Sequence, residues 1–192
     1  MKVIRKTEID TNAFMVGDQI DVNNYMATCQ KVEDDGYIFL LDQYLDEPMP
    51  MNDDDTTDGG YEESDLRKRV NSSEILDIFV SSGIGNRLVP FDNGDLIRIP
   101  YFSEMFGNDD LYRLFVEPDE YEQWPLMKLR PNRITGRTGF GCEYGWIQNK
   151  CIHRHKGFCL VGLDGFANNG DANLHFGVRP VFKVRKANWR KL

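Results

Sequence analysis

Residues suited to metal binding or thiol chemistry gather in one short stretch of the chain. The cluster consists of Cys142, Cys151, His153, His155 and Cys159. Thiolate and imidazole are the ligands that zinc selects, but structural zinc sites usually form on tight knuckles, and no Cys-x-x-Cys pair occurs here. The alternation of His153 and His155 would instead place both rings on the same face of a strand. Zinc binding by the cluster is one alternative, and a structural role with Cys159 as a small buried apolar residue is the other.

A second candidate for metal binding is the acidic segment 46–65. It contains nine Asp and Glu and no Lys or Arg. An EF-hand loop needs glycine at its sixth position and glutamate at its twelfth, and counting from Asp53 these positions hold Asp58 and Ser64. That motif therefore fails, and an irregular calcium site stays open. We expect a mobile surface loop over residues 46–62, because such a composition buries little apolar surface.

The residues that best suit ligand recognition lie between positions 144 and 175. Three side chains alternate from position 144 to 148, which would place them on one face of a strand, and the histidines follow directly. A polar loop expected over 166–175 supplies Asn and Asp, which make adaptable hydrogen bonds, although the same residues are common in turns. The expected ligand-binding residues are Tyr144, Trp146, Gln148, His153, His155, Asn168, Asn169, Asp171, Asn173 and His175.

Composition limits the class of protein that could carry these residues. With 192 residues, 41% of them hydrophobic, the chain can form one domain with a substantial core, expected over about 17–184. No apolar run reaches the roughly 20 residues that a membrane helix needs. The charged first residues do not resemble a secretory signal, so we expect a soluble protein of the cytoplasm or of a virion, with its cysteines as thiols.

Charge is distributed unevenly along the chain. Residues 126–192 contain 13 Lys and Arg and 3 Asp and Glu, whereas residues 1–125 contain 10 and 28. A basic face could bind an anionic partner such as a nucleic acid. We favour the simpler interpretation that the two parts neutralise each other within one fold, and we do not expect nucleic-acid binding.

Local patterns predict short strands and helices in alternation. Strands are expected over 17–22, 25–32 and 37–41, with an Asp-Asp-Gly turn making the last two a hairpin whose second strand is central. Ser64 can cap a first helix, and Asn71 with Glu74 forms a capping-box-like start for a second. Segments 86–91 and 95–99 suggest another hairpin, and 101–115 is helical or irregular. A strand at 157–163 and a final strand at 177–184, covered on both faces, complete the order.

Several of these segments together resemble a family of uncharacterised domains from gut bacteria and their phages. Family members carry, in order, an aromatic-x-x-S-x-L-R segment followed by asparagine, a D-x-x-x-L-x-S-x-x-E segment, W-L-R-S and G-V-R-P-x-F. Arg69 and Pro131 stand where the family has tryptophan and serine. The corresponding stretches here are residues 61–67 with Asn71, 95–99 with Ser103 and Glu104, 129–131, and 177–182.

That family is similar to C-type-lectin-like domains, which include formylglycine-generating enzymes. The resemblance implies an α+β fold: a single C-type-lectin-like domain with short antiparallel sheets, paired terminal strands and two or more flanking helices. Long loops on an upper sheet would carry the ligand contacts. Copper-dependent oxidation by a pair such as Cys151 and Cys159 is the enzymatic alternative that the resemblance implies.

Three arginines are expected to be structural. Arg67, Arg130 and Arg179 lie in the matched segments, and a guanidinium beside a strand end commonly bonds carboxylates or carbonyl groups within the fold. We assign no catalytic residue. The sequence therefore predicts a non-enzymatic recognition or structural module of a bacterial or phage system, with a protein or carbohydrate ligand. A metal-binding or oxidase-like protein and a nucleic-acid-binding protein are the alternatives.

Overall fold

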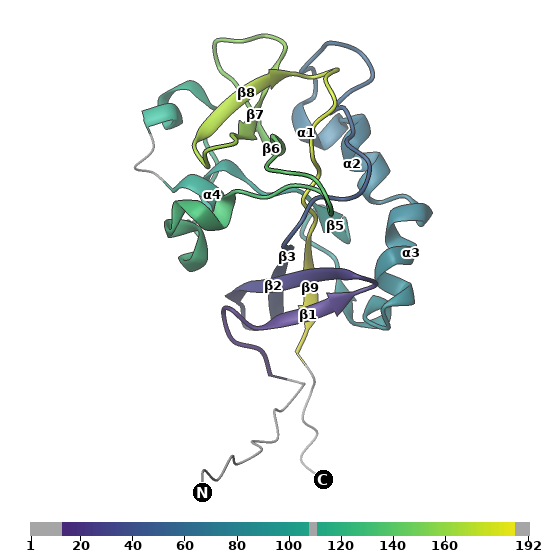
Figure 1. The fold of residues 1–192 in the computed structure, drawn as a ribbon. Coiled ribbons are helices and arrows are strands. Elements are labelled where there is room, and N and C mark those ends of the chain that lie inside the picture. The colour runs from purple at the N-terminus through teal and green to yellow at the C-terminus, as the bar shows by residue number, and fades with distance from the viewer. Residues whose placement is uncertain (1–12, 108–110, 187–192) are drawn as a thin grey trace, which may run out of the picture.

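A computed structural model describes residues 13–107 and 111–186, and it shows a mixed α+β architecture with two antiparallel sheets (Figure 1). The larger sheet contains β1 (Gln19–Val22), β2 (Tyr25–Val32), β3 (Gly36–Leu41), β4 (Leu88–Val89), β5 (Ile97–Arg98) and β9 (Val181–Arg185). The smaller sheet contains β6 (Gly145–Lys150), β7 (Gly157–Val161) and β8 (Ala167–Asp171). The expected α+β class is confirmed, but the expected pairing of the terminal strands is wrong, because β2 and β3 lie between β1 and β9.

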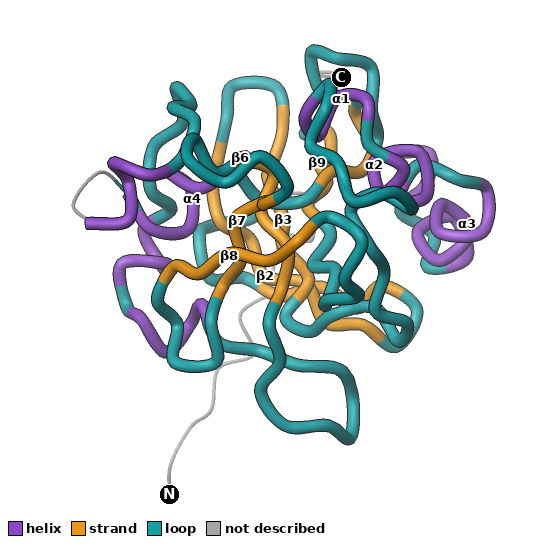
Figure 2. Tube along the Cα trace, turned by 90° about the horizontal axis from the view of Figure 1, so that it is seen from above, coloured by secondary structure: helices purple, strands orange, loops and turns teal. Residues whose placement is uncertain are grey.

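Helices lie on two opposite flanks of the strands, as the two views in Figures 1 and 2 agree. One flank holds α1 (Gly60–Glu63), α2 (Asp65–Val70) and α3 (Ser73–Ser81), and the other holds α4 (Phe102–Phe106). Short 3₁₀ turns occur at Gly85–Arg87, Leu111–Phe115, Pro125–Lys128 and Arg130–Arg133. Within the described residues, none of the helices is long and apolar enough to cross a bilayer.

The centre of the larger sheet is the pair formed by β3 and β9. Phe39 lies opposite Phe182, and β4 and β5 both pair with the other edge of β9. Every residue of β3 is buried, and its side chains alternate between two apolar clusters, with Phe39 in one and Leu40 in the other. In β9, Phe182 and Val184 belong to the first cluster and Val181 to the second, so the prediction that the final strand is covered on both faces is confirmed.

A buried tyrosine connects the two sheets. Tyr44 is 1% exposed and lies against Gly145 of β6 and Gly177, which form a parallel bridge with each other. A Cβ atom at either glycine would overlap the Tyr44 ring, so both positions exclude any side chain. The backbone N–H of Trp146 also donates to the Gly177 carbonyl at 3.0 Å. The smaller sheet is thereby fixed to the segment that leads into β9.

The helix starts confirm one prediction and correct another. The Ser64 hydroxyl accepts a hydrogen bond from the Arg67 N–H at 3.1 Å and caps α2, as expected. Asn71 does not cap α3, which begins after Ser72. The Asn71 amide instead donates to the Ile97 carbonyl at 2.7 Å and accepts from the Ile97 N–H at 3.1 Å. An amide can donate and accept at once, and here it bonds the backbone of β5 rather than its own helix.

Two other predictions about strands are wrong. The turn at 92–94 exists, with the Phe91 N–H donating to the Asp95 carbonyl at 2.8 Å, but β4 and β5 pair with β9 and not with each other. The loop expected over 166–175 is largely β8, which pairs with β7 over its whole length. Its Asn- and Gly-rich sequence has a low strand propensity, which pairing with a buried neighbour overrides.

The acidic segment 46–62 is held at several points. Met51 is fully buried, Met49 forms a bridge with Phe176, and the Asn52 N–H donates to the Ala172 carbonyl at 3.0 Å. The segment was expected to bury little apolar surface, and composition does not show that a single methionine within it packs into the core. Its mobility stays a prediction.

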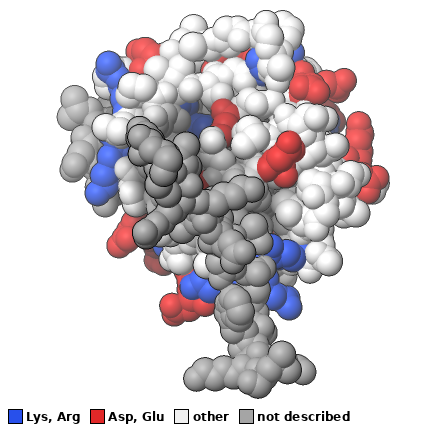
Figure 3. Space-filling view, turned by 60° about the horizontal axis from the view of Figure 1, so that its bottom comes forward, with Lys and Arg blue, Asp and Glu red and all other residues white. Residues whose placement is uncertain are grey.

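The acidic and basic parts of the chain meet in the fold. On the face shown in Figure 3, basic and acidic side chains are interspersed. This mixture of charges supports the interpretation that the two parts neutralise each other. That face has no continuous basic surface of the kind that nucleic-acid binding would need. Ion pairs that join residues 1–125 to residues 126–192 are Lys150–Glu117, Lys156–Asp55, Lys183–Glu33 and Lys183–Asp35, at 3.2, 2.6, 2.9 and 2.6 Å.

Stability is expected to fall in acid. A hydrogen bond from Arg137 holds the pKa of Glu143 below its usual value, and the Asp53 backbone N–H does the same for Asp65. A carboxylate whose pKa is lower in the folded protein than in the unfolded chain stabilises the fold at pH values above the unfolded-state pKa. This contribution to stability is lost as the pH falls through the folded-state pKa. We expect less than about 1 kcal/mol per carboxylate to be lost below about pH 5, because both groups are partly exposed.

Urea denaturation at several pH values between 7 and about 3 measures this effect. The Glu143→Gln variant should show a shallower dependence of the unfolding free energy on pH than the parent. A parent protein that becomes more stable in acid would contradict the assignment.

Candidate ligand-binding site

The Cys/His cluster does not assemble in the fold. Cys142 is exposed, Cys151 and Cys159 are buried, and both histidines are exposed. Within residues 13–107 and 111–186, no group of three or more His, Cys, Asp or Glu side chains is placed to hold a metal ion. The residues proposed as zinc ligands therefore do not form one coordination site.

Two of these cysteines do meet. A hydrogen bond with Cys159 lowers the pKa of the Cys151 thiol, burial opposes that shift, and the Tyr112 hydroxyl adds to it. The amide of Asn169 on β8 donates to the same hydroxyl. Asn169, expected to contact a ligand, is therefore partly engaged inside the fold.

The three alternating residues, Tyr144 directly before β6 and Trp146 and Gln148 within it, are half-buried or buried. Trp146 is 1% exposed, and its indole N–H donates to the Met49 carbonyl at 2.7 Å. Tyr144 is half-buried and packs edge-on against Phe176. Trp146 cannot serve as an open ligand contact, and this expectation is corrected: alternation shows which side chains share a face, not whether that face is covered.

The remaining expected ligand residues lie at or near the surface. His153 and His155 lie in the turn between β6 and β7, and Asn168, Asn173 and His175 are exposed on or after β8. Asp171 accepts from the Arg154 guanidinium at 2.7 Å, so its charge is balanced locally. Trp146 and Gln148, by contrast, are buried.

The three arginines behave differently. Arg67 bonds the Asp95 carboxylate at 2.6 Å, as expected of a structural residue. Arg179 is buried and donates to backbone carbonyls. Arg130 is exposed, with its guanidinium carbon 4.4 Å from the centre of the Phe166 ring, so it stacks on an aromatic side chain instead of bonding inside the fold.

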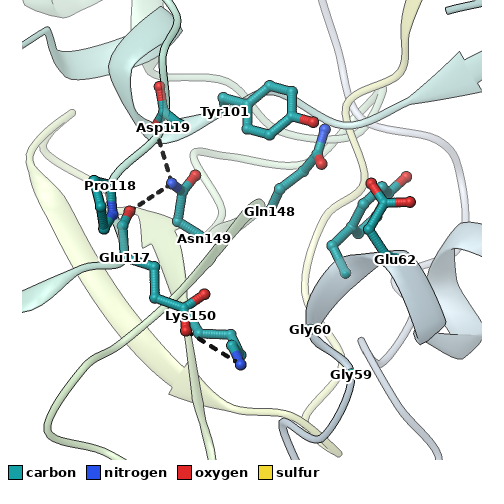
Figure 4. Close-up of a pocket in the computed structure, with 11 residues that line it drawn as sticks. Gly59, Gly60, Glu62, Tyr101, Glu117, Pro118, Asp119, Gln148, Asn149 and Lys150 are labelled. Carbon is teal, nitrogen blue, oxygen red and sulfur yellow. Dashed lines mark hydrogen bonds and ion pairs between the residues drawn. The ribbon is translucent and has the colours of Figure 1, made fainter. Parts of the chain in front are cut away.

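A pocket of about 310 Å³ lies between α1, β6 and the segment 117–119 (Figure 4). This is within the range of roughly 300–1,000 Å³ typical of small-ligand sites. We call it the α1–β6 pocket. It is lined by Gly59, Gly60, Tyr61, Glu62, Tyr101, Glu117, Pro118, Asp119, Gln148, Asn149 and Lys150.

An irregularity in β6 explains why three consecutive residues reach this pocket. A regular strand would send Gln148, Asn149 and Lys150 to alternate faces. The pairing register with β7 shifts between Trp146 and Lys150, and such irregularities redirect side chains. The β6 strand therefore supplies two amides and one ammonium group to the same cavity.

Asn149 fixes the walls of the α1–β6 pocket. Its side-chain oxygen accepts from the Phe102 N–H at 2.7 Å, at the start of α4. Its amide nitrogen donates to the Glu117 carbonyl and to the Asp119 carboxylate, each at 2.9 Å. Asn149 is 7% exposed, so these bonds are largely shielded from water and hold the opposite wall in place.

Tyr101 is held by a buried ion pair. Arg98 donates to both carboxylate oxygens of Glu104, at 2.7 and 2.6 Å, and the Tyr101 N–H donates to the same carboxylate at 2.9 Å. The Tyr101 ring stacks on Tyr121 at 4.0 Å between centroids, and the Arg98 guanidinium lies 5.0 Å from the Tyr101 ring centre. Burial raises the pKa of Tyr101, so its hydroxyl stays protonated at neutral pH.

Every carboxylate that lines the pocket has a basic neighbour. Glu62 lies 2.9 Å from Arg67, Glu117 lies 3.2 Å from Lys150, and Asp119 lies 3.8 Å from Arg113. This arrangement balances the local charge and leaves hydrogen-bonding atoms along the walls. The pocket therefore suits a neutral, polar ligand better than a free ion.

A wider, open cavity of about 700 Å³ borders the pocket at Tyr101. The two cavities share Tyr101, Pro118 and Asp119. A ligand longer than one small ring could therefore extend along this groove. Gln148 was among the expected ligand residues and lines the pocket, whereas the other lining residues were not predicted. The adjacent amides Gln148 and Asn149, both buried in β6, were a usable signal.

Comparisons of the chain with protein-family models, curated proteins and solved structures gave no match. The described residues thus define an α+β domain with a polar pocket. The similarity to C-type-lectin-like domains stays a prediction.

Proposed function

We propose that this protein is a non-enzymatic recognition module that binds a neutral, hydroxyl-rich ligand of the carbohydrate class in the α1–β6 pocket. The single observation that carries the proposal is the convergence of fixed amide, carboxylate and tyrosine groups on a charge-balanced cavity. The predicted lectin-like fold and the predicted bacterial or phage origin belong to this proposal and agree with it.

The arrangement of donors and acceptors supports a sugar ligand. The amide of Gln148 and the hydroxyl end of Tyr101 lie toward each other, and Glu62 lies across the cavity from Asn149 (Figure 4). Sugar hydroxyls donate and accept hydrogen bonds. The Gln148 amide donates one hydrogen to the Ile99 carbonyl at 2.7 Å and can offer its second N–H, while the Glu62 carboxylate can accept. Rigid positions reduce the entropy lost on binding. The groove beyond Tyr101 would accept a second sugar unit.

A glycan array of bacterial and host oligosaccharides, followed by calorimetry on the strongest binder, tests the proposal. We expect Glu62→Gln to weaken affinity at least about tenfold, because hydrogen bonds to a charged group contribute roughly 1.5–3 kcal/mol. Glu63→Gln is the matched control, since Glu63 is an exposed neighbour that does not line the pocket. Absence of saturable glycan binding, or equal losses in both variants, would refute the proposal.

A further inference from the structure

A second cavity, of about 330 Å³, lies beside the opening strands of the larger sheet and shares no residue with the α1–β6 pocket. It is bounded by β1, β2 and the residue that follows β3 on one side, and by the segment 126–134 on the other. We call it the β2 cavity. It is lined by Gln19, Thr28, Gln30, Asp42, Leu126, Met127, Pro131, Asn132, Ile134 and Arg179.

Gln30 lines this cavity, and its side-chain amide oxygen is buried. It is the extra residue where the β2–β3 register shifts between Cys29 and Lys31, and it is 1% exposed. Its amide nitrogen donates to the Thr28 carbonyl at 3.2 Å, which fixes the orientation of the amide. The amide oxygen has no hydrogen-bond partner among the described residues, a costly state for a buried acceptor.

Arg179 brings a positive charge that no carboxylate balances at ion-pair distance within the described part of the chain. It is 6% exposed, and its guanidinium donates to the Leu41 carbonyl at 2.6 Å and to the Asn132 carbonyl at 3.3 Å. Burial lowers the pKa of Arg179, which reflects the cost of keeping this charge away from water. A bound carboxylate would offset that cost through a charge-assisted hydrogen bond.

Asp42 supplies the opposite charge in the same cavity. One carboxylate oxygen accepts from the Thr28 hydroxyl at 2.6 Å and the other from the Gln19 amide at 2.8 Å. Both donors are neutral, and among residues 13–107 and 111–186 no Lys, Arg or His lies at ion-pair distance from it. The cavity thus contains one positive and one negative group that are not paired with each other at contact distance.

We propose that the β2 cavity binds a free α-amino acid with an aliphatic side chain. Arg179 would hold its carboxylate, Asp42 and the Gln30 amide oxygen would hold its ammonium group, and Leu126 with Ile134 would contact its side chain. A simple anion would be repelled by Asp42 and a simple cation by Arg179, whereas a zwitterion satisfies both. The inference is independent of the proposed glycan binding.

Calorimetry of the full chain with leucine, leucinamide and N-acetylleucine tests this proposal. We expect saturable binding of leucine and at least about tenfold weaker binding of each blocked analogue, because each lacks one of the two charges. Binding of all three with equal affinity, or no binding of leucine, methionine or valine at millimolar concentration, would overturn it.

Variants of the lining residues locate the binding. Asp42→Asn keeps the shape of the side chain, and we expect it to weaken leucine binding at least about tenfold. Gln30→Met should also weaken it, whereas Glu62→Gln in the α1–β6 pocket should not. If the Asp42 variant does not fold, the comparison of leucine with its blocked analogues on the parent protein decides the matter. Unchanged leucine affinity in a folded Asp42→Asn variant would contradict the assignment.

Discussion

The Glu104→Gln variant is expected to lose about 3–5 kcal/mol of unfolding free energy. Arg98 and Glu104 are 4% and 3% exposed, and each satisfies the other's charge through paired hydrogen bonds. Removing the negative charge leaves the guanidinium buried without a counter-charge, and water cannot reach it to compensate. The glutamine amide offers one acceptor oxygen instead of two, so it cannot keep both bonds from Arg98 together with the bond from the Tyr101 N–H, and the α1–β6 pocket should also lose its shape.

Urea denaturation measures this loss, and two controls define its origin. The double variant Arg98→Met with Glu104→Leu should recover much of the stability, because it removes both buried charges together. Glu62→Gln breaks an exposed pair with Arg67 and should cost less than about 1 kcal/mol. A Glu104→Gln protein as stable as its parent would show that the buried pair is not required.

The Trp146→Ala variant is expected to lose about 3–5 kcal/mol, a loss typical of large aromatic residues in a core. The indole is 1% exposed, packs edge-on against Phe158 and Phe176, and donates to the Met49 carbonyl. Alanine would leave a cavity in the apolar cluster that includes Phe182, and the Met49 carbonyl would lose the indole bond and keep the one from the Phe176 N–H.

Phe140→Ala is the matched aromatic control for this variant. Phe140 is 63% exposed, so its removal should change stability by no more than about 0.5 kcal/mol. If the unfolding free energy of both variants depends on urea concentration with the same slope as that of the parent, the three free energies can be compared directly. If Trp146→Ala kept full stability and lost only ligand binding, the tryptophan would belong to a recognition surface after all.

The parts of the fold that the sequence predicted correctly depend on local signals. The turn before β3 and the continuous apolar run of that strand lie within a few residues of each other. Ser64 precedes its helix directly, and its cap requires no distant partner. In the same way, the apolar residues on both faces of the final strand show that it is buried, although they do not show which strands it pairs with.

The errors concern pairing and burial that distant segments decide. Segments β4 and β5 have only two residues each, and they pair with β9 because that strand offers a longer edge. The alternation around Trp146 was recognised correctly, yet the cover over that face comes from residues near Met49 and Phe176. The pocket residues Tyr101 and Asn149 come together only through the buried pair at Arg98 and the irregular β6 strand.

The central position of β9 has a consequence for how the chain reaches its native state. The Arg179 guanidinium bonds the Leu41 carbonyl across 138 positions of sequence, at the point where β9 enters the sheet. Contacts this remote form only after a large loop has closed, which slows folding relative to domains built from local contacts. During synthesis on the ribosome, the edge of β3 stays unpaired until the final strand has been made. An unpaired strand edge can pair with another chain, so we expect aggregation in this interval to begin at β3.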